Sequence, residues 1–455
     1  MEVQRTKRVQ RREKSDPGSI ERHVRQRLAD KVSGNMMGIW LLVPEHLRLG
    51  TWDLLQGWTG QPDENVEPRL ALQLLHEAAL CVSGVRQGRT LSDKGFELAN
   101  GLPFIASDQA IHQLLDAHTV EQAQALQVAL GRIRRATGHY QGKLLAIDPH
   151  HLRSHTKRQT PRRQHRHNEQ ATKTLQTFFC LDADTCQPLG FGIASPAKTA
   201  TQGAKELLGM AAQILNPTQG QTLVLADKEH CTAALFAHAA QHTPFDLLTP
   251  MPNTSHVRKQ LQSLPDEAFT GRWAGLATTT RPHRFFRDSQ LEVYQMVQRL
   301  GEGENNRHRN AFLCTAPRDE LASLTQDFPK RWHIEEFFNT HQALGWKRAG
   351  TLNLNIRYGQ ASVALLAQAS LHQLRQRLGP PYANWEASHL AQTLFKGLDG
   401  DLRVQGDTIF VTYYNAPNAQ KLREQYENLP QKLVRENVDP HVPWLYNFKL
   451  DFRFK

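Results

Sequence analysis

Two short apolar runs in the middle of the chain each stop at an aspartate. Residues 144–147 are followed by Asp148, and residues 222–226 are followed by Asp227. A continuous apolar run of about five residues, bounded by glycine or polar residues, is typical of a strand buried on both faces of a sheet. Because ligands bind at the edge of such α/β sheets, we expect both carboxylates to lie in a binding site there.

A third acid lies on an expected helix that begins near Pro329, since proline is well placed in the first turn of a helix. Four residues of this helix are spaced by four, three and four positions and so share one stripe: Arg331, Glu335, Phe338 and Gln342. The simplest interpretation is a surface ion pair between Arg331 and Glu335, which contributes about 0.2–0.5 kcal/mol. The alternative is that Glu335 is a site residue held beside an arginine.

The order of the predicted elements around these acids indicates an α/β fold. After the Asp148 strand we expect a hairpin at residues 174–181 and 188–193, a helix at 201–215 and the Asp227 strand. An Ala-rich helix that ends at about residue 242 and a fifth strand at 245–248 should follow. This order predicts an RNase H-like core. Asp182 and Asp184 lie in the hairpin turn, where turn chemistry explains them better than ligand binding. Strand-like pieces at 291–297 and 311–315 precede the third acid.

The two ends of the chain have different patterns from the core. Residues 1–14 are rich in Arg and Lys and predict either a basic arm on phosphate groups or a solvated tail. Short helices then follow to residue 140, with Arg86 and Arg89 between them. They are compatible with a helix-turn-helix DNA reader and also with a helical packing domain. We predict three parts: a helical DNA-binding domain at 1–140, the catalytic domain at 141–380, and a small α+β C-terminal segment at 381–455.

Charge and cysteine content narrow the function. The chain carries 55 Lys and Arg against 44 Asp and Glu, a net charge of +11, which favours a nucleic acid as partner. Its five cysteines form no CxxC pair, which argues against a zinc site or a disulfide framework and fits the reducing cytoplasm. The longest apolar run, residues 36–43, is too short to span a bilayer, so no membrane partner is expected.

A basic stretch at residues 150–167 follows the first acid. It holds five His, five Arg and one Lys. So many cations beside three acids are best tolerated next to an anionic substrate, which predicts a phosphate-contacting loop with Arg153, Lys157 and Arg158 as DNA-binding candidates. A metal site is the alternative, but the histidines are irregularly spaced and lack a cysteine partner.

The succession strand–Asp148, strand–Asp227, helix–Glu335 resembles the DDE transposases of bacterial insertion sequences, over roughly residues 140–380. One branch of that family has a signature of Tyr, two residues, Arg, three residues, Glu, six residues, Lys. Here the four positions are Phe328, Arg331, Glu335 and Gln342. Arg and Glu match, whereas Tyr is replaced by Phe and Lys by Gln.

The same resemblance bears on the neighbours of the acids. The register of the signature selects Glu335 over the adjacent Glu336. The branch often carries a small residue and an aromatic shortly after the second acid, where this chain has Glu229 and Thr232. It also carries a β-rich insertion before the third acid, which corresponds here to residues 250–320. Trp273 lies in that insertion, and we expect it to be a buried core residue, with base stacking as the alternative.

The resemblance implies a mechanism. Three carboxylates without Cys or His partners suit hard cations, here two Mg²⁺ or Mn²⁺ ions. Asp148 would bridge both ions, and Asp227 and Glu335 would hold one each. Water would first cut the transposon ends, and the freed 3′-hydroxyl would then attack target DNA. Double-stranded DNA, contacted in part by Phe328, Arg331 and Gln342, would be the partner of a homodimer on the bacterial nucleoid.

Two other functions are compatible with the same residues. One is a nuclease on the same fold that only hydrolyses DNA. The other is a catalytically silent DNA-binding relic of a transposase, which the replacements at Phe328 and Gln342 keep open. Joined DNA products would identify a transposase, and inverted repeats flanking the coding sequence would support the same conclusion.

Overall fold

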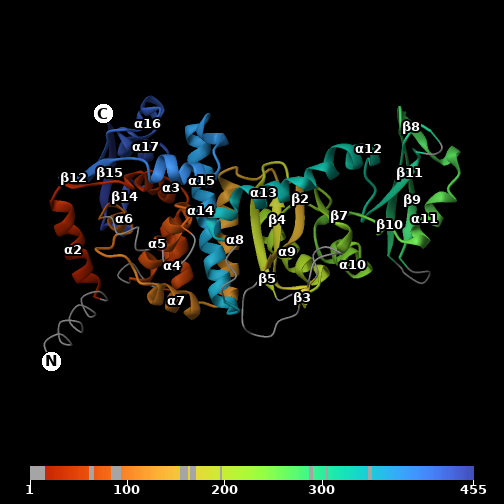
Figure 1. Ribbon diagram of the computed structural model, residues 1–455, viewed down its shortest axis with the longest axis horizontal. Coiled ribbons are helices and arrows are strands. Elements are labelled where there is room, and N and C mark those ends of the chain that lie inside the picture. The colour runs from red at the N-terminus through yellow and green to blue at the C-terminus, as the bar shows by residue number, and fades with distance from the viewer. Residues whose placement is uncertain are drawn as a thin grey trace. The chain divides into compact units, whose positions relative to one another are not determined.

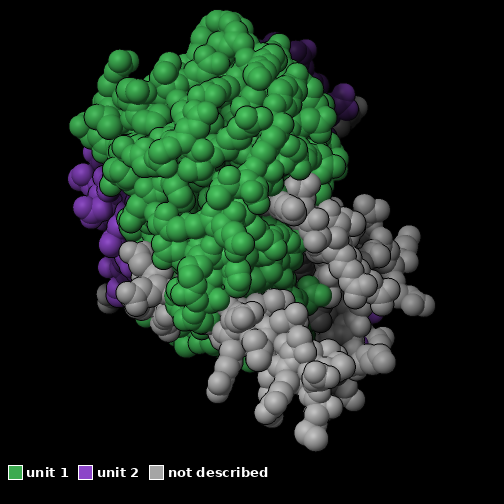
Figure 2. All heavy atoms as spheres, turned by 90° about the vertical axis from the view of Figure 1, so that its left-hand side faces the viewer, with its two compact units in different colours: residues 1–130, 340–455 green, residues 131–339 purple. Residues whose placement is uncertain are grey.

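The computed structural model describes residues 16–60, 66–82, 94–153, 162–163, 171–194, 197–285, 291–303, 306–346 and 351–455 (Figure 1). The predicted basic arm, Arg86, Arg89, Lys157 and Arg158 lie outside these residues. The chain divides into two compact units, which are coloured separately in Figure 2. Unit 1 comprises residues 1–130 and 340–455, and unit 2 comprises residues 131–339.

Unit 2 is built on one large mixed sheet. Its core strands are β2 (Leu144–Arg153), β3 (Arg162–Arg163), β4 (Thr172–Asp182), β5 (Gln187–Ala194), β6 (Thr222–Ala226) and β7 (Phe245–Pro250). Strands β2, β6 and β7 run parallel, and β4 pairs antiparallel with both β2 and β5. Helices α9 (Ala200–Leu215) and α10 (Ala233–His242) follow β5 and β6. This mixed α/β arrangement is consistent with the predicted RNase H-like core.

Helix α9 lies unusually close to the sheet, and its sequence explains why. Thr199 and Gln202 form a capping box that starts the helix. Gly203 then faces strand β4, where an added Cβ would lie 2.6 Å from the ring of Phe178. The missing side chain is therefore what lets the helix backbone approach the aromatic core.

The β-rich insertion continues the same sheet. Its strands are β8 (Thr270–Trp273), β9 (Leu276–Arg284), β10 (Glu292–Leu300) and β11 (His308–Cys314), with β11 pairing antiparallel to β7. Helix α11 (Ser255–Gln262) and η4 (Asp266–Ala268) precede them, and Figure 1 shows α11 beside the strands. The two predicted strand pieces correspond to β10 and β11. The sequence did not predict β8 or β9, because β9 carries Pro282 and few apolar residues after Ala277.

The segment with the third acid is not the single helix that was expected. It begins with α12 (Glu320–Ala322) and changes through a π-helix, a 3₁₀-helix, an α-helix and a further 3₁₀-helix: η6 (Ser323–Asp327), η7 (Phe328–Trp332), α13 (His333–His341) and η8 (Gln342–Leu344). The predicted stripe assumed α-helical spacing from Arg331 to Gln342. That spacing holds only within α13, so Gln342 begins the next element.

Unit 1 combines both ends of the chain. Its first part holds, in chain order, α2 (Pro17–Ala29), β1 (Val32–Gly34), η1 (Met37–Leu42), α3 (Val43–Arg48), α4 (Thr51–Thr59), α5 (Glu67–Ala79), α6 (Lys94–Ala99), α7 (Asp108–Ala117) and the start of α8 (Val120–Ala136). Its second part holds α14 (Leu354–Leu378), η9 (Tyr382–Asn384), α15 (Ala387–Leu390), η10 (Ala391–Phe395), β12 (Gly400–Gln405), β13 (Thr408–Tyr413), α16 (Ala419–Tyr426), α17 (Leu429–Arg435), β14 (His441–Val442), η11 (Pro443–Leu445) and β15 (Phe448–Phe454).

The two parts of unit 1 share one sheet and one core. The strand order β1-β12-β13-β15-β14 places the N-terminal β1 beside the C-terminal hairpin. Trp444 packs against Trp52 with ring centroids 5.8 Å apart, and the Tyr413 hydroxyl donates to the carbonyl of Met37. The compact units thus differ from the predicted division into 1–140, 141–380 and 381–455. Within the described residues, no helix combines the length and apolar character needed to cross a bilayer.

Candidate active site

The first two acids lie where the parallel pairing of the central strands ends. Ile147 of β2 pairs with Ala226 of β6, and the next residues along the two strands are Asp148 and Asp227. Strand β2 does not end at Asp148 as expected but continues to Arg153, because it still pairs antiparallel with β4. Asp227 is the N-cap of η3 (Lys228–His230), where its carboxylate accepts from the Lys228 backbone N–H. Both carboxylates therefore lie at one sheet edge.

The third acid is brought to the same edge by aromatic packing. Phe338 of α13 packs edge-on against Phe179 of β4, at 5.1 Å between ring centroids, and stacks on His150 of β2 at 4.4 Å. Phe337 packs against the same Phe179 ring. These contacts bury one face of α13 on the sheet. Glu335 lies in the first turn of that helix and is partly exposed.

Charge interactions join the acids into one site. Burial raises the pKa of Asp148 to about 7; the charge of Arg331 opposes the shift, whereas repulsion from Asp227, Glu335 and Glu229 adds to it. Only groups that lie near one another influence each other's pKa in this way. Glu229 is an additional acid at the site. The sequence analysis noted it only as a departure from the pattern that follows the second acid, and not as a site residue.

Arg331 and the adjacent glutamates have distinct surroundings. A guanidinium nitrogen of Arg331 lies 3.5 Å from a carboxylate oxygen of Glu335, and the arginine side chain is only 14% exposed. The charge of Glu335 contributes to the raised pKa of Asp148. The charge of the neighbouring Glu336 contributes instead to the raised pKa of the Cys186 thiol, although burial is the main cause of that shift. The two glutamates therefore point to different surroundings, and Glu335 is the one near Asp148.

A buried histidine lies beside the second acid and was not predicted. His230 ends η3, and burial lowers its pKa to about 4, so the imidazole is neutral at pH 7. Among the described residues, no hydrogen-bond partner lies within reach of its Nδ1 atom. A lone histidine after an aspartate carries no sequence signal that distinguishes this position from any other.

The predicted DNA-binding residues are found in several places. Phe328 packs edge-on against Phe312 of the insertion at 4.9 Å, which places its ring at least partly in the core. Arg331 lies beside Glu335, and Gln342 begins η8 in unit 1. Arg153 is the last residue of β2. Lys157 and Arg158 belong to the part of the chain that the structure does not describe.

The chemistry of the donors fits a hard cation, although the site is not preassembled. Asp148, Asp227, Glu335 and Glu229 supply only carboxylate oxygens, the ligands that Mg²⁺ and Mn²⁺ prefer. Burial is the main cause of the raised pKa of Asp148, and the neighbouring carboxylates add to it; a divalent cation bound there would favour the ionised form. Within the described ranges, however, no three His, Cys, Asp or Glu side chains are gathered closely enough to hold a metal ion.

Two predictions about residues outside the acids have opposite outcomes. The turn interpretation of Asp182 is confirmed, because its carboxylate accepts from the backbone N–H groups of Asp184, Thr185 and Gly142 at 3.1, 3.0 and 2.7 Å. The expectation that Trp273 is a core residue is wrong, since the side chain is 56% exposed. It lies on β8, an edge strand whose residues are all exposed.

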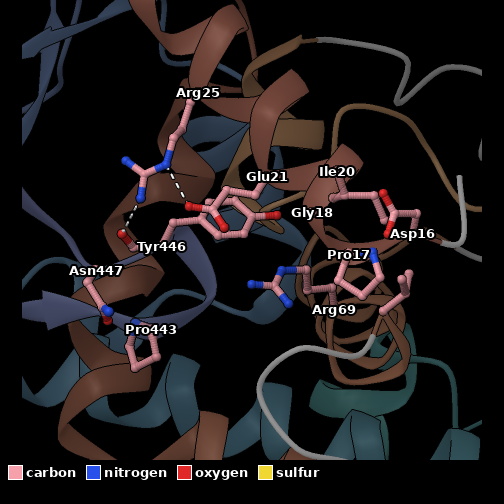
Figure 3. A pocket seen from close by; sticks show the side chains of 11 residues that line it. Asp16, Pro17, Gly18, Ile20, Glu21, Arg25, Arg69, Pro443, Tyr446 and Asn447 are labelled. Carbon is pink, nitrogen blue, oxygen red and sulfur yellow. Dashed lines mark hydrogen bonds and ion pairs between the residues drawn. The ribbon is translucent and has the colours of Figure 1, made fainter. Parts of the chain in front are cut away.

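Two cavities lie away from the acids. One, of about 500 Å³ in unit 1, is lined by Arg25, Arg69 and Tyr446, and Figure 3 shows Arg25 bonded to Glu21 and to the Tyr446 carbonyl. The other, of about 850 Å³ in unit 2, is lined by Lys330 and Asp184 among others. None of the predicted site residues that the structure describes lines either cavity. Asp148, Asp227 and Glu335 are each partly exposed.

Comparisons with known proteins give one family match and similarity to solved structures. Residues 139–368, about half of the chain, match the family model described as "Transposase DDE domain". Among solved structures, the chain is similar to a piggyBac transposase in a synaptic complex with hairpin DNA, determined by cryo-EM, with a TM-score of 0.42 and 11% sequence identity. The similarity covers 80% of this chain and 82% of that one. No curated protein sequence matches the chain.

Proposed function

The chain belongs to the transposase DDE domain family, and from this premise we propose that it is an active DNA transposase that cuts the ends of a mobile element and joins them to target DNA. The observation that carries the proposal is the electrostatic coupling of Asp148 with Asp227 and Glu335 at one sheet edge. Repulsion from Asp227 and Glu335 adds to the raised pKa of Asp148, so packing alone gives no reason to bring these carboxylates together.

Asp148, Asp227 and Glu335 are the residues that would hold divalent cations. Mg²⁺ or Mn²⁺ bound there would stabilise the attacking and leaving oxygens of a phosphoryl transfer on DNA. Arg331 orients the Glu335 carboxylate through their 3.5 Å contact. The neutral His230 fills space beside Asp227 without adding a positive charge. The protein itself forms no covalent bond to DNA in this scheme.

The finer features of the proposal come from the signature. Arg331 and Glu335 match the branch of bacterial insertion sequences, and the partners would be the element's inverted ends and the target duplex, with a homodimer holding both ends. Phe328 and Gln342 depart from the signature at positions expected to contact DNA rather than metal. We therefore infer that chemistry is retained while the hold on the cut end is weakened.

The test uses the full chain and DNA that carries the inverted repeats flanking its coding sequence. The variants Asp148→Asn, Asp227→Asn and Glu335→Gln should bind end-containing DNA like the wild type but neither cut nor join it in Mg²⁺ or Mn²⁺. Glu336→Gln is the matched control and should remain active. Normal cleavage by Glu335→Gln together with loss in Glu336→Gln would reject the assignment of the third acid.

Two alternative functions give different products in the same assay. Cut but never joined DNA, with cleavage lost in all three acid variants, would indicate a nuclease. Sequence-specific binding without cleavage by the wild type in either metal would indicate a silent DNA-binding relic. Joined products that disappear in the acid variants support the transposase.

A further inference from the structure

The segment that carries Glu335 is held on its outer side by the turn between β4 and β5. Lys330 Nζ donates to an Asp184 carboxylate oxygen at 2.7 Å, and His333 Nδ1 donates to the carbonyl of Ala183 at 2.7 Å. Lys330 and His333 precede Glu335 by five and two residues. Two consecutive residues of one turn thus hold two residues just before the third acid.

The turn is a fixed point and not a loose loop. The buried Asp182 carboxylate binds three backbone N–H groups, those of Asp184, Thr185 and Gly142. The last of these bonds ties the turn to the residues that lead into β2, the strand of Asp148. The Asp184 side chain is only 10% exposed, so solvent screens its ion pair with Lys330 less than it screens an ordinary surface pair.

The segment needs such a fixed point because its own backbone does not set its direction. The chain passes from the π-helix η6 to the 3₁₀-helix η7 and then to α13 within the residues before Glu335. Each change of helix type alters the rotation per residue, so the direction of Glu335 depends on where the segment is held. Phe337 and Phe338 hold the inner face against Phe179. The Asp184 contact holds the other side.

We propose that Asp184 is a positioning residue for Glu335, acting through Lys330 and assisted by the Ala183–His333 hydrogen bond. In this role Asp184 acts through its contact with Lys330 and not on DNA directly. With both contacts made, α13 is held at its start as well as along its aromatic face, and the Glu335 carboxylate is directed toward Asp148. The role of this residue rests on the proposed function, because it concerns the geometry of the proposed catalytic acids.

The variants isolate the contact from its neighbourhood. Asp184→Asn and Lys330→Gln each remove one charge of the pair, and the double variant Asp184→Lys with Lys330→Glu restores an ion pair of reversed sign. Asp327→Asn is the matched control: Asp327 lines the same cavity and lies close enough to Lys330 for their charges to interact. Among the described residues, no hydrogen bond or ion pair joins Asp327 to the β4–β5 turn, although it lies close enough to Asp184 for the two negative charges to repel.

We expect the two single variants to lower the cleavage rate by about tenfold to a hundredfold, the scale set by a misplacement of about 1 Å in an active site. Their affinity for end DNA should stay unchanged, and a higher Mn²⁺ concentration should be needed for half-maximal rate. The reversed pair should recover most of the rate, and Asp327→Asn should match the wild type. A general loss of folding would lower DNA affinity as well and would not be repaired by reversal.

Hydrogen exchange gives a readout that does not depend on cleavage. The backbone amides of residues 330–339 should exchange faster in Asp184→Asn than in the wild type or in Asp327→Asn, while those of β2 and β6 stay protected. Unchanged exchange in this segment would overturn the positioning role, as would a reversed pair no better than the single variants. If exchange changes as expected but the wild type cuts no DNA, the proposed function is wrong, whereas the Asp184–Lys330 contact still holds the segment before Glu335.

Discussion

A chain of buried polar side chains in unit 1 predicts that acid destabilises this part of the molecule. Asn100 donates to the Phe96 carbonyl, so its Oδ1 accepts from His76 Nδ1 at 2.6 Å. His76 Nε2 then accepts from His46 Nε2, 3.0 Å away, and His46 Nδ1 lies 3.1 Å from the Ser370 hydroxyl, which also donates to the Leu366 carbonyl. The contact between the two imidazoles pairs a donor with an acceptor only while His76 is neutral. A proton on His76 Nε2 would place two N–H groups face to face.

The magnitude follows from the pKa of these groups. Burial lowers the pKa of His76 to about 4 from its ordinary 6.5, although the bond to Asn100 opposes the shift, and burial followed by the charge of His76 lowers the pKa of His46. Between pH 6.5 and pH 4 the unfolded chain binds more protons than the folded chain. The contribution of neutral His76 to the free energy of unfolding is therefore fully present above pH 6.5 and is lost as the pH falls toward 4. His76 alone accounts for about 2 kcal/mol at pH 5 and about 3 kcal/mol below pH 4.

Urea unfolding followed by tryptophan emission measures this loss in unit 1 selectively. The buried tryptophans all belong to unit 1: Trp40, Trp52, Trp58, Trp346 and Trp444. The two tryptophans of unit 2, Trp273 and Trp332, are 56% and 58% exposed. A red shift of the emission therefore reports mainly on unit 1. The free energy of unfolding should be at least about 2 kcal/mol lower at pH 5 than at pH 7.5.

The double variant His46→Gln with His76→Gln separates this effect from other titrating groups. Its stability at pH 7.5 should be lower than that of the wild type, but the difference between pH 7.5 and pH 5 should shrink by about 2 kcal/mol or more. Equal pH dependence in the two proteins would show that the histidines do not titrate on unfolding, and the assignment of the neutral network would be wrong.

Three further predictions follow from packing and charge. Gly203→Ala should lower the stability of unit 2 by about 1–3 kcal/mol because its Cβ meets the Phe178 ring, whereas Gly209→Ala on the same helix, with open space around it, should be neutral or stabilising in thermal unfolding. A fragment of residues 1–140 should show no cooperative unfolding, because β1 loses β12 and Trp52 loses Trp444; a sharp transition in that fragment would contradict the shared core. Gln342→Lys should tighten binding of end DNA and steepen the slope of log K against log salt by about 0.9, one phosphate contact; an unchanged slope would show that this position does not face DNA.

The sequence was most informative where local pattern and tertiary role coincide. The apolar runs before Asp148 and Asp227 predicted β2 and β6, because strands buried on both faces leave a continuous apolar signal. The turn role of Asp182 was equally local. The shift from π to 3₁₀ to α geometry before Glu335 was not predictable, since a change of helix type leaves no local pattern and the segment's partners Phe179 and Asp184 lie far away along the chain.

Long-range pairing also explains what was missed in unit 1 and in the insertion. Nothing in residues 32–34 indicates that their strand partner is near residue 400, because such short strands carry no signal of register. The exposure of Trp273 depends on β8 being an edge strand, and strand order is a property of the whole sheet. A large aromatic in an apolar context is usually buried, so local reasoning favoured the core.

The interleaving of the two units sets an order for folding during synthesis. Unit 2 is complete once residue 339 has been made, but unit 1 lacks β12, β13 and β15 until the last residues have left the ribosome. At elongation rates of about 5–20 residues per second, residues 340–455 take roughly 6–23 seconds to synthesise. The core bearing the acids is therefore finished while the N-terminal helices still wait for their partner strands. A translation product that stops early carries the three acids without a completed unit 1.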